Sequence, residues 1–456
     1  MNIKNDIINK KITVLGAGRS GIGIAKLLTR NKAAVFVSDS SPKEKLMYFD
    51  EKVFQNYSID YEIGRNSDKI YDSEIFVVSP GISPNSDVLK KAVKKNIKIL
   101  SEVEVSSYFC EVPTIAITGT NGKTTTTELT GAILREAGYD VYICGNVGLA
   151  FSEIIPKLSS DSVVVIEVSS FQLEYTVDFK PRVAMILNIT PDHIDWHLSF
   201  ENYVNAKFKI CRNQSADDLT IINYDDSILK NEIKNLKSTM GAFSKDKIIN
   251  DKIAVKCFLE DSEIKYMEES INNIIRKDEI LLRGTHNIMN SMAAILAVKK
   301  FNVNNDVIKK VLRNFKGVEH RIEFVREIDG VRYYNDSKAT NYDSLYVALE
   351  SFDKNIILIM GGKKGAENFE TVDALIKDRV KFICAIGQSC SSISDHYKDI
   401  KTVNNFDTLE EAVKFAKNNS VRGDYVLFSP GYKSFDMFNN FEHRGEVFKS
   451  IVSTLK

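Results

Sequence analysis

Residues 114–134 read TIAITGTNGKTTTTELTGAIL, a short β-branched run followed by a glycine-rich turn and then a stretch with helical character. A strand, a turn and a helix in this order form a phosphate-binding loop, because the amides of the turn and of the first helical residues point at an anion. Gly119 and Gly122 lie in the turn, with Lys123 and Thr124 directly after it. The stretch therefore predicts an α/β fold with a nucleotide at this turn.

The side chains of the turn indicate a nucleoside triphosphate. Lys123 would neutralise the terminal phosphates, and the Thr124 hydroxyl can hold Mg²⁺. The spacing departs from the strict GxxxxGKT pattern, because Ile117 occupies the place of the first glycine. The alternative, a glycine-rich turn without a ligand, does not explain a strand followed by GKTTTT. We predict ATP binding by the loop residues Gly119, Thr120, Asn121, Gly122, Lys123, Thr124 and Thr125.

On both sides of this loop, β-branched runs alternate with amphipathic stretches. Continuous apolar runs are typical of strands buried on both faces, so the alternation predicts parallel sheets covered by helices. A chain of 456 residues also exceeds the size of a single core. We predict three α/β domains: a Rossmann-like domain at 1–100, a central P-loop ATPase-type domain at 101–317 and a C-terminal Rossmann-like domain at 318–456.

A second glycine motif, ITVLGAGRSGIG, lies near the N-terminus. Its glycines follow a predicted strand, and Asp39 ends the next one, as in turns that bind a dinucleotide pyrophosphate. The turn SPGIS at 79–83 follows another predicted strand and would reach the same crevice. The alternative is a tight turn without a ligand. The predicted nucleotide or nucleotide-sugar site comprises Gly16, Gly18, Ser20, Gly21, Asp39, Ser40, Ser79 and Gly81.

Metal-binding side chains follow the phosphate loop. Glu167 ends the run VVVIE, and His193 lies in PDHID after the next strand. Because the carboxyl ends of parallel strands meet at one edge of the sheet, an acid there can hold the Mg²⁺ that bridges nucleotide oxygens. The alternative is that Glu167 is a solvent-exposed residue that only caps the strand end. No thiolate spacing supports zinc, and His193 and His197 could be turn residues. By spacing alone Lys207 and Lys209, in the predicted helix ENYVNAKFKIC, are surface charges.

The composition is that of an ordinary globular protein: 43% hydrophobic residues, with 61 basic and 61 acidic side chains. This balance gives no indication of nucleic acid or of an anionic membrane surface. No apolar run has the length of a signal peptide or a membrane span, so we expect a cytoplasmic protein. Six cysteines without a CxxC pair are expected to be reduced, buried small hydrophobes: Cys110, Cys144, Cys211, Cys257, Cys384 and Cys390.

Taken together, the motifs resemble those of the Mur ligases, in the same order and over nearly the whole chain. The GAGRSG turn with SPGI and the C-terminal SFDMFNNFEHRG are most similar to the members that add D-glutamate to UDP-N-acetylmuramoyl-L-alanine. The DNPR motif of the diaminopimelate- or lysine-adding members is absent. The resemblance implies a monomeric ligase that forms an acyl phosphate from ATP. It rests on GTNGKTT, EVSSFQLE, PDHID, AKFKI, GTHNIMN, EHRIE, YNDSKATN and SPGYKSFDMFNNFEHRG.

The resemblance also implies roles that spacing leaves open. Lys207, as a carbamate, would serve with His193 at a second Mg²⁺ site, with Thr124 and Glu167 as the other metal ligands. Lys209, two residues further along the helix, faces another direction and is less suited to be the carbamate-bearing lysine. Asn146 in CGNVG would line the muramoyl substrate. Lys123, His193, Lys207 and Lys338 would be catalytic.

For the remaining substrate groups, the resemblance places Asn287 and Asn290 near adenine, with helix capping as the alternative for Asn287. Arg321 and Lys338 would contact phosphates and Asp336 the ribose. GGKKG lacks the acidic residue that many relatives have before the lysine, so Lys363 remains an alternative to Lys364. The implied amino-acid pocket comprises Thr340, Lys364, Ser434, Phe435 and Phe441.

Other activities explain less of the sequence. An NAD-dependent oxidoreductase would account for GAGRSG and Asp39 but not for the second nucleotide loop or the third domain. A nucleotide-dependent regulator or scaffold would not need the acids and Lys207. A folylpolyglutamate synthase shares the phosphate loop but should lack the GAGRSG domain. Another Mur-type amino-acid ligase is the alternative within the enzyme class.

Overall fold

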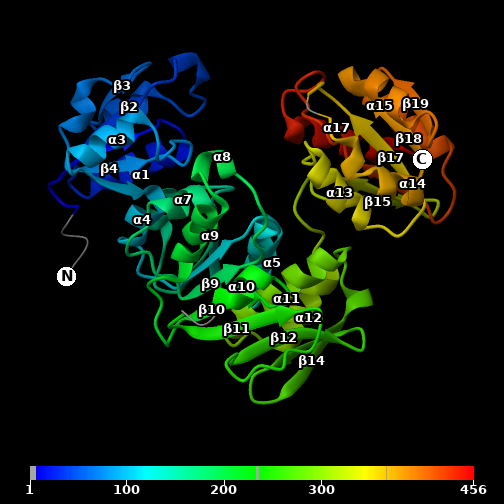
Figure 1. Cartoon of the computed structure of the whole chain (residues 1–456), viewed down its shortest axis with the longest axis horizontal. Coiled ribbons are helices and arrows are strands. Elements are labelled where there is room, and N and C mark those ends of the chain that lie inside the picture. The colour runs from blue at the N-terminus through cyan, green and yellow to red at the C-terminus, as the bar shows by residue number, and fades with distance from the viewer. Residues whose placement is uncertain (1–6, 233–235, 366) are drawn as a thin grey trace. The chain divides into compact units, whose positions relative to one another are not determined.

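The computed structural model describes residues 7–232, 236–365 and 367–456 (Figure 1). These residues form two compact units, one running to Glu279 and including Met289–Arg313, the other containing Ile280–Ile288 and Asn314–Lys456. Three sheets confirm the predicted three α/β domains: two lie in the first unit and one in the second. The predicted boundaries at 100/101 and 317/318 remain predictions.

The first sheet is parallel, with strand order β3-β2-β1-β4-β5. Alternate residues of its strands enter two buried clusters: Val14 and Val77 belong to one, and Phe76 and Val78 to the other. Two-sided burial explains why these strands read as continuous apolar runs. The strands are β1 (Lys11–Leu15), β2 (Ala34–Asp39), β3 (Asp60–Ile63), β4 (Ile75–Val78) and β5 (Lys98–Ser101).

The second sheet has nine strands in the order β14-β13-β12-β11-β10-β9-β6-β8-β7. It is parallel from β7 to β12, and β12, β13 and β14 form antiparallel hairpins. The phosphate loop leaves β6, which lies between β8 and β9. The strands are β6 (Thr114–Thr118), β7 (Asp140–Gly145), β8 (Ser162–Glu167), β9 (Val183–Ile186), β10 (Leu219–Asn223), β11 (Thr239–Ser244), β12 (Val255–Glu260), β13 (Glu263–Met267) and β14 (Ile271–Arg276).

The third sheet has the order β15-β16-β20-β17-β18-β19, with β15 as its antiparallel edge strand. Leu358 and Met360 pack in a cluster on one face, and Ile357 and Ile359 in a cluster on the other. The order reverses between β17 and β20, the point at which open α/β sheets bind ligands. The strands are β15 (Glu323–Ile328), β16 (Val331–Asn335), β17 (Ile356–Gly361), β18 (Val380–Ile386), β19 (Thr402–Phe406) and β20 (Tyr425–Phe428).

Most helices lie in the crossover connections between parallel strands, whereas α4, α11 and α12 lie between sheets and α17 follows the last strand. Within the described ranges, none combines the length and the apolar character needed to cross a membrane. The helices are α1 (Arg19–Arg30), α2 (Glu51–Asn56), α3 (Asp87–Lys94), α4 (Glu102–Ser107), α5 (Lys123–Glu136), α6 (Phe151–Ile154), α7 (Ser170–Glu174), α8 (Ile194–His197), α9 (Phe200–Phe208), α10 (Ser227–Glu232), α11 (Thr285–Lys299), α12 (Asn305–Asn314), α13 (Tyr342–Glu350), α14 (Asp373–Arg379), α15 (Cys390–Tyr397), α16 (Leu409–Asn418) and α17 (Phe441–Thr454).

All six cysteines are free thiols, as expected. The expectation that all six are buried is wrong for Cys110 and Cys390, which are partly exposed. Cys110 lies just before β6, within 3.6 Å of the Thr114 hydroxyl, and Cys390 begins α15. Both sit at the ends of elements, where the chain comes to the surface.

Candidate active site

The phosphate loop turns sharply between β6 and α5. Gly122 precedes α5 with φ of 84°, a left-handed conformation that favours glycine. A Cβ atom on Gly122 would lie 2.5 Å from the side-chain Oδ1 of Asn290. The loop therefore takes the shape that the motif predicts, and Asn290 packs directly against it.

Two lysines converge on one carbonyl of this loop. The Lys123 Nζ donates to the carbonyls of Gly119 at 2.9 Å and Thr120 at 2.8 Å, and the Lys207 Nζ donates to the same Gly119 carbonyl at 2.8 Å. Lys207 is only 2% exposed. Burial, followed by the charge of Lys123, lowers the pKa of Lys207 to about 6. A neutral amine is therefore within reach at neutral pH.

The prediction from spacing that Lys207 and Lys209 are surface charges is wrong for Lys207, because the face of α9 that carries it packs inward against the loop. Its Nζ also lies 4.5 Å from the centroid of the Tyr203 ring. Lys209 follows the end of α9, and its Nζ pairs with Glu174 Oε1 at 2.9 Å. The two lysines thus have different surroundings, and Lys207 is the one at the phosphate loop.

Glu167 ends β8 beside the phosphate loop and is 2% exposed. Its Oε1 accepts a hydrogen bond from Asn146 Nδ2 at 2.9 Å, and its Oε2 is buried without a hydrogen-bond partner among the described residues. A buried carboxylate oxygen without a donor is costly unless a cation binds it. The geometry fits the predicted Mg²⁺ ligand and brings Asn146, the predicted substrate residue, to the same carboxylate.

His193 and His197 differ in their surroundings. His193 has φ of 53°, is partly exposed, and its ring centroid lies 4.7 Å from that of Phe171. His197 is buried, and its Nε2 lies 3.0 Å from Ser170 Oγ. Burial and the nearby charge of Lys207 lower the pKa of His197 to about 4. His193 is therefore the histidine available to a ligand, and His197 is a neutral packing residue rather than a turn histidine.

Sequence reasoning missed two residues that hold the phosphate loop. Asn188 follows β9 and binds Asn121 twice: its Oδ1 accepts from the Asn121 amide at 2.8 Å, and its Nδ2 donates to the Asn121 carbonyl at 3.1 Å. The Tyr203 hydroxyl lies 3.0 Å from Thr120 Oγ1. The asparagine directly after the β9 run was the available signal for Asn188. Tyr203 gave none, because its partner is 83 positions away.

The N-terminal glycine turn lies where the first sheet reverses its strand order, between β1 and β4. Gly16 follows β1 with φ of 104°, and a Cβ there would lie 2.3 Å from Ser79 Oγ after β4. The structure thus brings the turns GAGRSG and SPGIS together. A Cβ on Gly21 would lie 1.9 Å from the Gly16 carbonyl oxygen, whereas a Cβ on Gly18 would meet no atom of the described residues within 4 Å. Gly21 is required by the fold, and Gly18 leaves space.

Asp39, predicted as a substrate residue, bonds to the protein's own backbone. Its Oδ2 accepts from the Ala17 amide at 2.7 Å and its Oδ1 from the Ser41 amide at 2.8 Å. It therefore shapes the glycine turn. Ser20 is partly exposed, Ser40 and Gly81 are exposed, and the Ser79 hydroxyl is buried with no hydrogen-bond partner in the described part of the chain.

In the second unit, Asp336 follows β16 and is buried. Its Oδ2 accepts from Ser429 Oγ at 2.7 Å and its Oδ1 from the Ile322 amide at 3.1 Å. Burial raises the pKa of Asp336 to about 7, and the Arg321 and Arg444 charges oppose that rise. Arg321 therefore lies near Asp336. This proximity agrees with the prediction that both residues contact the same nucleotide.

Arg444, in the FEHRG motif, was given no role by sequence reasoning. It is 1% exposed, and its guanidinium donates to Ser337 Oγ at 3.0 Å, to the Ser337 carbonyl at 2.7 Å and to the Tyr432 carbonyl at 3.0 Å. The Lys338 Nζ lies 5.8 Å from the Phe441 ring centroid. Arg444 thus ties α17 to the segment that carries Lys338.

Thr340, Lys364, Ser434 and Phe435 lie on three loops of the third sheet, and Phe441 begins α17. The loops after β17 and β20 pair through the Gly361 amide with the Pro430 carbonyl and the Lys363 amide with the Lys433 carbonyl, both at 2.9 Å. This pairing brings the lysine loop beside the loop that carries Ser434, which is buried. Lys363 and Lys364 are both exposed, and Phe435 is 61% exposed. Thr340 lies on the third loop, directly before α13.

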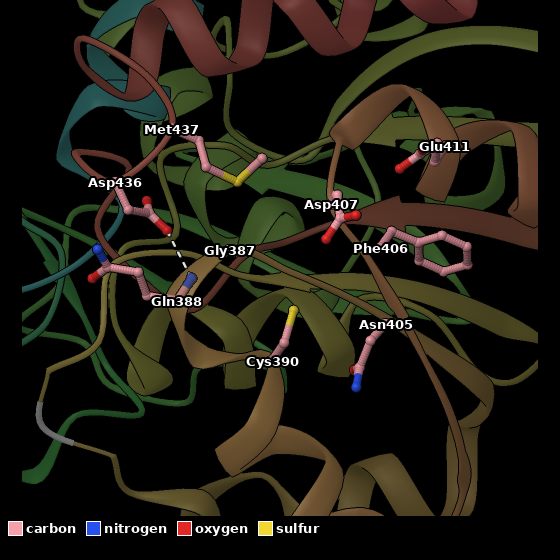
Figure 2. Close-up of a pocket in the computed structure, with 9 residues that line it drawn as sticks. All are labelled: Gly387, Gln388, Cys390, Asn405, Phe406, Asp407, Glu411, Asp436 and Met437. Carbon is pink, nitrogen blue, oxygen red and sulfur yellow. Dashed lines mark hydrogen bonds between the residues drawn. The ribbon is translucent and has the colours of Figure 1, made fainter.

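A cavity of about 630 Å³ opens at the carboxyl ends of β18 and β19 (Figure 2). In Figure 2 the Asp436 carboxylate accepts a hydrogen bond from the Gln388 amide, at 3.0 Å. Its walls carry three carboxylates and none of the predicted site residues, so like charges would repel a dicarboxylic amino acid. The walls are formed by Gly387, Gln388, Cys390, Asn405, Phe406, Asp407, Glu411, Asp436 and Met437.

The predicted ATP residues divide between the two units. Residues 119–125 and Asn290 belong to the first, while Asn287, Arg321, Asp336 and Lys338 belong to the second. Asn287 is in the first turn of α11, and its Nδ2 donates to the Arg283 carbonyl at 2.7 Å, so it is not the residue that caps the helix from outside.

Comparison with known families finds three matches in chain order. Residues 11–88 match the MurD N-terminal domain, residues 117–298 the Mur ligase middle domain, and residues 320–431 the Mur ligase glutamate ligase domain. The three do not overlap and correspond to the three sheets.

Full-length relatives are similar along the whole chain. The UDP-N-acetylmuramoylalanine–D-glutamate ligase of Caldicellulosiruptor saccharolyticus is 39% identical over 456 residues, covering 99% of this chain and 100% of the relative. The enzyme of the same description from Caldicellulosiruptor bescii is 40% identical over 459 residues, covering 99% of both. That from Salinibacter ruber is 36% identical, again covering 99% of both.

Solved structures share the fold. UDP-N-acetylmuramate-alanine ligase MurC from Thermotoga maritima superposes with a TM-score of 0.56 at 18% identity, covering 98% of this chain and 100% of that one. MurF ligase from Thermotoga maritima in complex with ADP gives a TM-score of 0.56 at 16% identity, covering 99% and 96%. At such low identity these structures bear on the fold alone.

Proposed function

The chain belongs to the Mur ligase family, and we propose that it is the ATP-dependent ligase that joins D-glutamate to UDP-N-acetylmuramoyl-L-alanine in peptidoglycan precursor synthesis. The observation that carries this function is the similarity to D-glutamate ligases over 99% of the chain, at 39% identity. The site geometry agrees with it, because a nucleotide loop, a buried acid and a buried lysine meet in the first unit.

ATP is held first by the phosphate loop. The amides of residues 119–125 and the N-terminus of α5 face the phosphates, and Lys123 neutralises them once it leaves the loop's own carbonyls. Asn290 packs against the loop on the side where adenine is proposed. Asn287, Arg321, Asp336 and Lys338 of the second unit are proposed to complete the site around base, ribose and phosphates.

Thr124, Glu167, His193 and Lys207 are proposed to hold Mg²⁺. The orphaned Glu167 Oε2 fits a hard cation, which would neutralise charge on the phosphoryl oxygens in transfer. Lys207 is proposed to act as an anionic carbamate, which forms from a neutral amine, and its lowered pKa makes that amine available. As an ammonium it lies beside Lys123 on the Gly119 carbonyl, a repulsive arrangement in a dry site, whereas as a carbamate it would attract both Lys123 and the metal.

The reaction then proceeds in two steps. The substrate carboxylate attacks the γ-phosphorus of ATP, the bond from that phosphorus to the β–γ bridging oxygen breaks, and an acyl phosphate and ADP form, with Lys123 stabilising the charge on the oxygens in transfer. The D-glutamate amine attacks the acyl carbon through a tetrahedral intermediate, phosphate leaves, and an amide remains. The loops of Thr340, Lys364 and Ser434 are proposed to hold D-glutamate, with Phe435 and Phe441 against its chain.

At the N-terminal turn, the space above Gly18 is proposed to admit the UDP pyrophosphate, with Ser79 and Asn146 near the sugar. ATP and UDP-linked sugars are metabolites of the cytoplasm, so we propose that the enzyme acts there. The monomeric state implied by the resemblance remains a prediction.

The test is a substrate panel. Purified protein is incubated with ATP, Mg²⁺ and UDP-N-acetylmuramoyl-L-alanine, and D-Glu, L-Glu, L-Lys or meso-diaminopimelate is added separately, while phosphate release and product mass are followed. Release with D-Glu alone is expected. Release with another amino acid would assign a sister activity, and no release with any of them would overturn the ligase function.

A further inference from the structure

Four side chains in the second unit form a hydrogen-bonded chain that no substrate role requires. The Tyr432 hydroxyl donates to Glu367 Oε1 at 3.0 Å and lies 2.6 Å from the Tyr342 hydroxyl. Since the Tyr432 proton is directed to the carboxylate, Tyr342 must be the donor between the tyrosines. Ser392 Oγ donates to the same Glu367 oxygen at 2.6 Å.

Three members of this chain are close in sequence to residues of the proposed amino-acid pocket. Tyr342 is two positions after Thr340, and Tyr432 is two positions before Ser434. Glu367 is three positions after Lys364. The chain therefore joins all three loops that are proposed to hold D-glutamate.

The lysine loop is fixed on one side by backbone hydrogen bonds, in which the Gly361 and Lys363 amides donate to the Pro430 and Lys433 carbonyls. Lys363 and Lys364 are exposed, and the loop before them is fixed where the Gly362 amide donates to Ser389 Oγ at 3.0 Å. The Glu367 carboxylate fixes it on the far side. Because a loop that must be ordered on binding reduces affinity, a loop fixed at both sides would bind its ligand more tightly.

Tyr432 and Tyr342 suit this role because both are buried, at 2% and 5% exposure, in one apolar cluster. Burial raises the pKa of both hydroxyls above the usual range, so they stay protonated donors. A hydroxyl between a buried donor and a carboxylate has a defined position, and removing it leaves a buried partner unsatisfied.

We propose that Tyr432, with Tyr342 and Glu367, is a positioning group that holds the three amino-acid-binding loops in register and so sets the affinity for the amino-acid substrate. The inference rests on the proposed function, because it assumes that these loops bind the incoming amino acid. None of the three side chains is proposed to touch the reacting atoms.

The experiment compares the full-length wild type with Tyr432→Phe, Tyr342→Phe, the double variant, Glu367→Ala and Glu367→Gln. Tyr333→Phe is the matched control, because Tyr333 is equally buried but lies in the cluster on the opposite face of the sheet. We expect Tyr432→Phe to raise KM for D-Glu by roughly five- to tenfold, with KM for ATP and for the UDP substrate within about twofold of wild type.

The double variant should be no worse than about twofold beyond Tyr432→Phe, since both hydroxyls act through one chain. Glu367→Gln keeps an acceptor oxygen and should recover most of the affinity that Glu367→Ala loses. Equal KM values for Tyr432→Phe and Tyr333→Phe, or an equal rise for all three substrates, would overturn the proposal.

Hydrogen exchange of the peptide spanning 361–369 separates this inference from the proposed function. Tyr432→Phe should speed exchange there by roughly tenfold relative to Tyr333→Phe, whether or not the protein uses D-Glu. If the wild type prefers another amino acid, the proposed function is wrong. The KM values of the variants are then compared with that amino acid as the substrate. Unchanged exchange would sink the inference even in a fully active D-glutamate ligase.

Discussion

At the scale of single residues, Lys207 is the side chain whose chemistry depends most on its surroundings. Spacing indicates a solvated surface charge, but the structure buries the amine beside Lys123 on one carbonyl. Neighbouring Lys209 has an ordinary ion pair with Glu174. The two lysines are therefore a natural test pair, alike in sequence position and opposite in environment.

We expect Lys207→Ala to lower kcat by roughly a hundredfold or more, because a proposed metal ligand and charge-stabilising group is lost, and Lys209→Ala to stay within about threefold. Steady-state phosphate release measures both. A ¹³C-bicarbonate NMR experiment adds a readout that needs no turnover: a carbamate signal present in wild type and Lys209→Ala, and absent in Lys207→Ala. A signal that persists without Lys207 would refute the assignment.

Glu102 is a second residue whose behaviour follows from burial. Its Oε1 accepts from the Ser152 amide at 2.6 Å and from Ser106 Oγ at 3.2 Å, and burial raises its pKa. Between the ordinary glutamate pKa and the raised pKa of the folded state, Glu102 is protonated in the folded protein and ionised in the unfolded chain. The free energy of unfolding therefore falls as pH rises through this range. The loss is about 1.4 kcal/mol for each unit by which the pKa is raised.

Glu102→Gln keeps the acceptor oxygen and removes the titration. We expect it to melt at a higher temperature than wild type at pH 8 and to lose that advantage at pH 4. Thermal melts across this range measure the difference, with the exposed Glu201→Gln as control. A pH-independent difference between Glu102→Gln and wild type would show that the carboxyl does not titrate as inferred.

At the scale of elements, the turn from β1 into α1 separates glycines needed for folding from a glycine available to a ligand. A Cβ on Gly21 would overlap the Gly16 carbonyl oxygen, whereas in the described part of the chain one on Gly18 would meet no atom within 4 Å. Both residues belong to the same motif, and sequence gives them equal weight. The difference appears only when β1 and α1 are packed together.

We expect Gly21→Ala to destabilise the protein by roughly 1–3 kcal/mol, as overpacking does, and Gly18→Ala to leave the melting temperature nearly unchanged. If the pyrophosphate approaches Gly18, the same Gly18→Ala variant should raise KM for the UDP substrate by roughly tenfold while KM for ATP holds. Equal melting temperatures for the two variants would contradict the packing, and an unchanged KM would contradict the ligand.

At the scale of the whole molecule, the proposed ATP residues belong to two units: Lys123 to the first, Asp336 and Lys338 to the second. The proposed mechanism would bring them to one nucleotide, and closure would also exclude water from the acyl phosphate. We expect ATP with Mg²⁺ to change the solution scattering profile and lower the radius of gyration. Profiles that coincide with and without nucleotide would count against closure, and AMP serves as the control ligand.

Much of this protein was determined by its sequence alone. The buried strands of three sheets could be predicted, because strands covered on both faces are continuously apolar. The phosphate loop could be predicted because its glycines, Lys123 and Thr124 are neighbours in the chain. Glu167 and His193 were predicted as metal ligands from their positions after predicted strands. All of these patterns are local in the sequence, so they can be recognised without the tertiary structure.

The tertiary structure decided what depends on contacts between distant segments. It buried Lys207 against Gly119, 88 positions away, left Glu167 Oε2 without a donor among the residues that the structure describes, and turned Asp39 to the backbone. It also linked Tyr342 to Tyr432, 90 positions apart. Burial and partner together set the charge and orientation of a side chain, and neither is encoded in the residue type or in its neighbours along the chain.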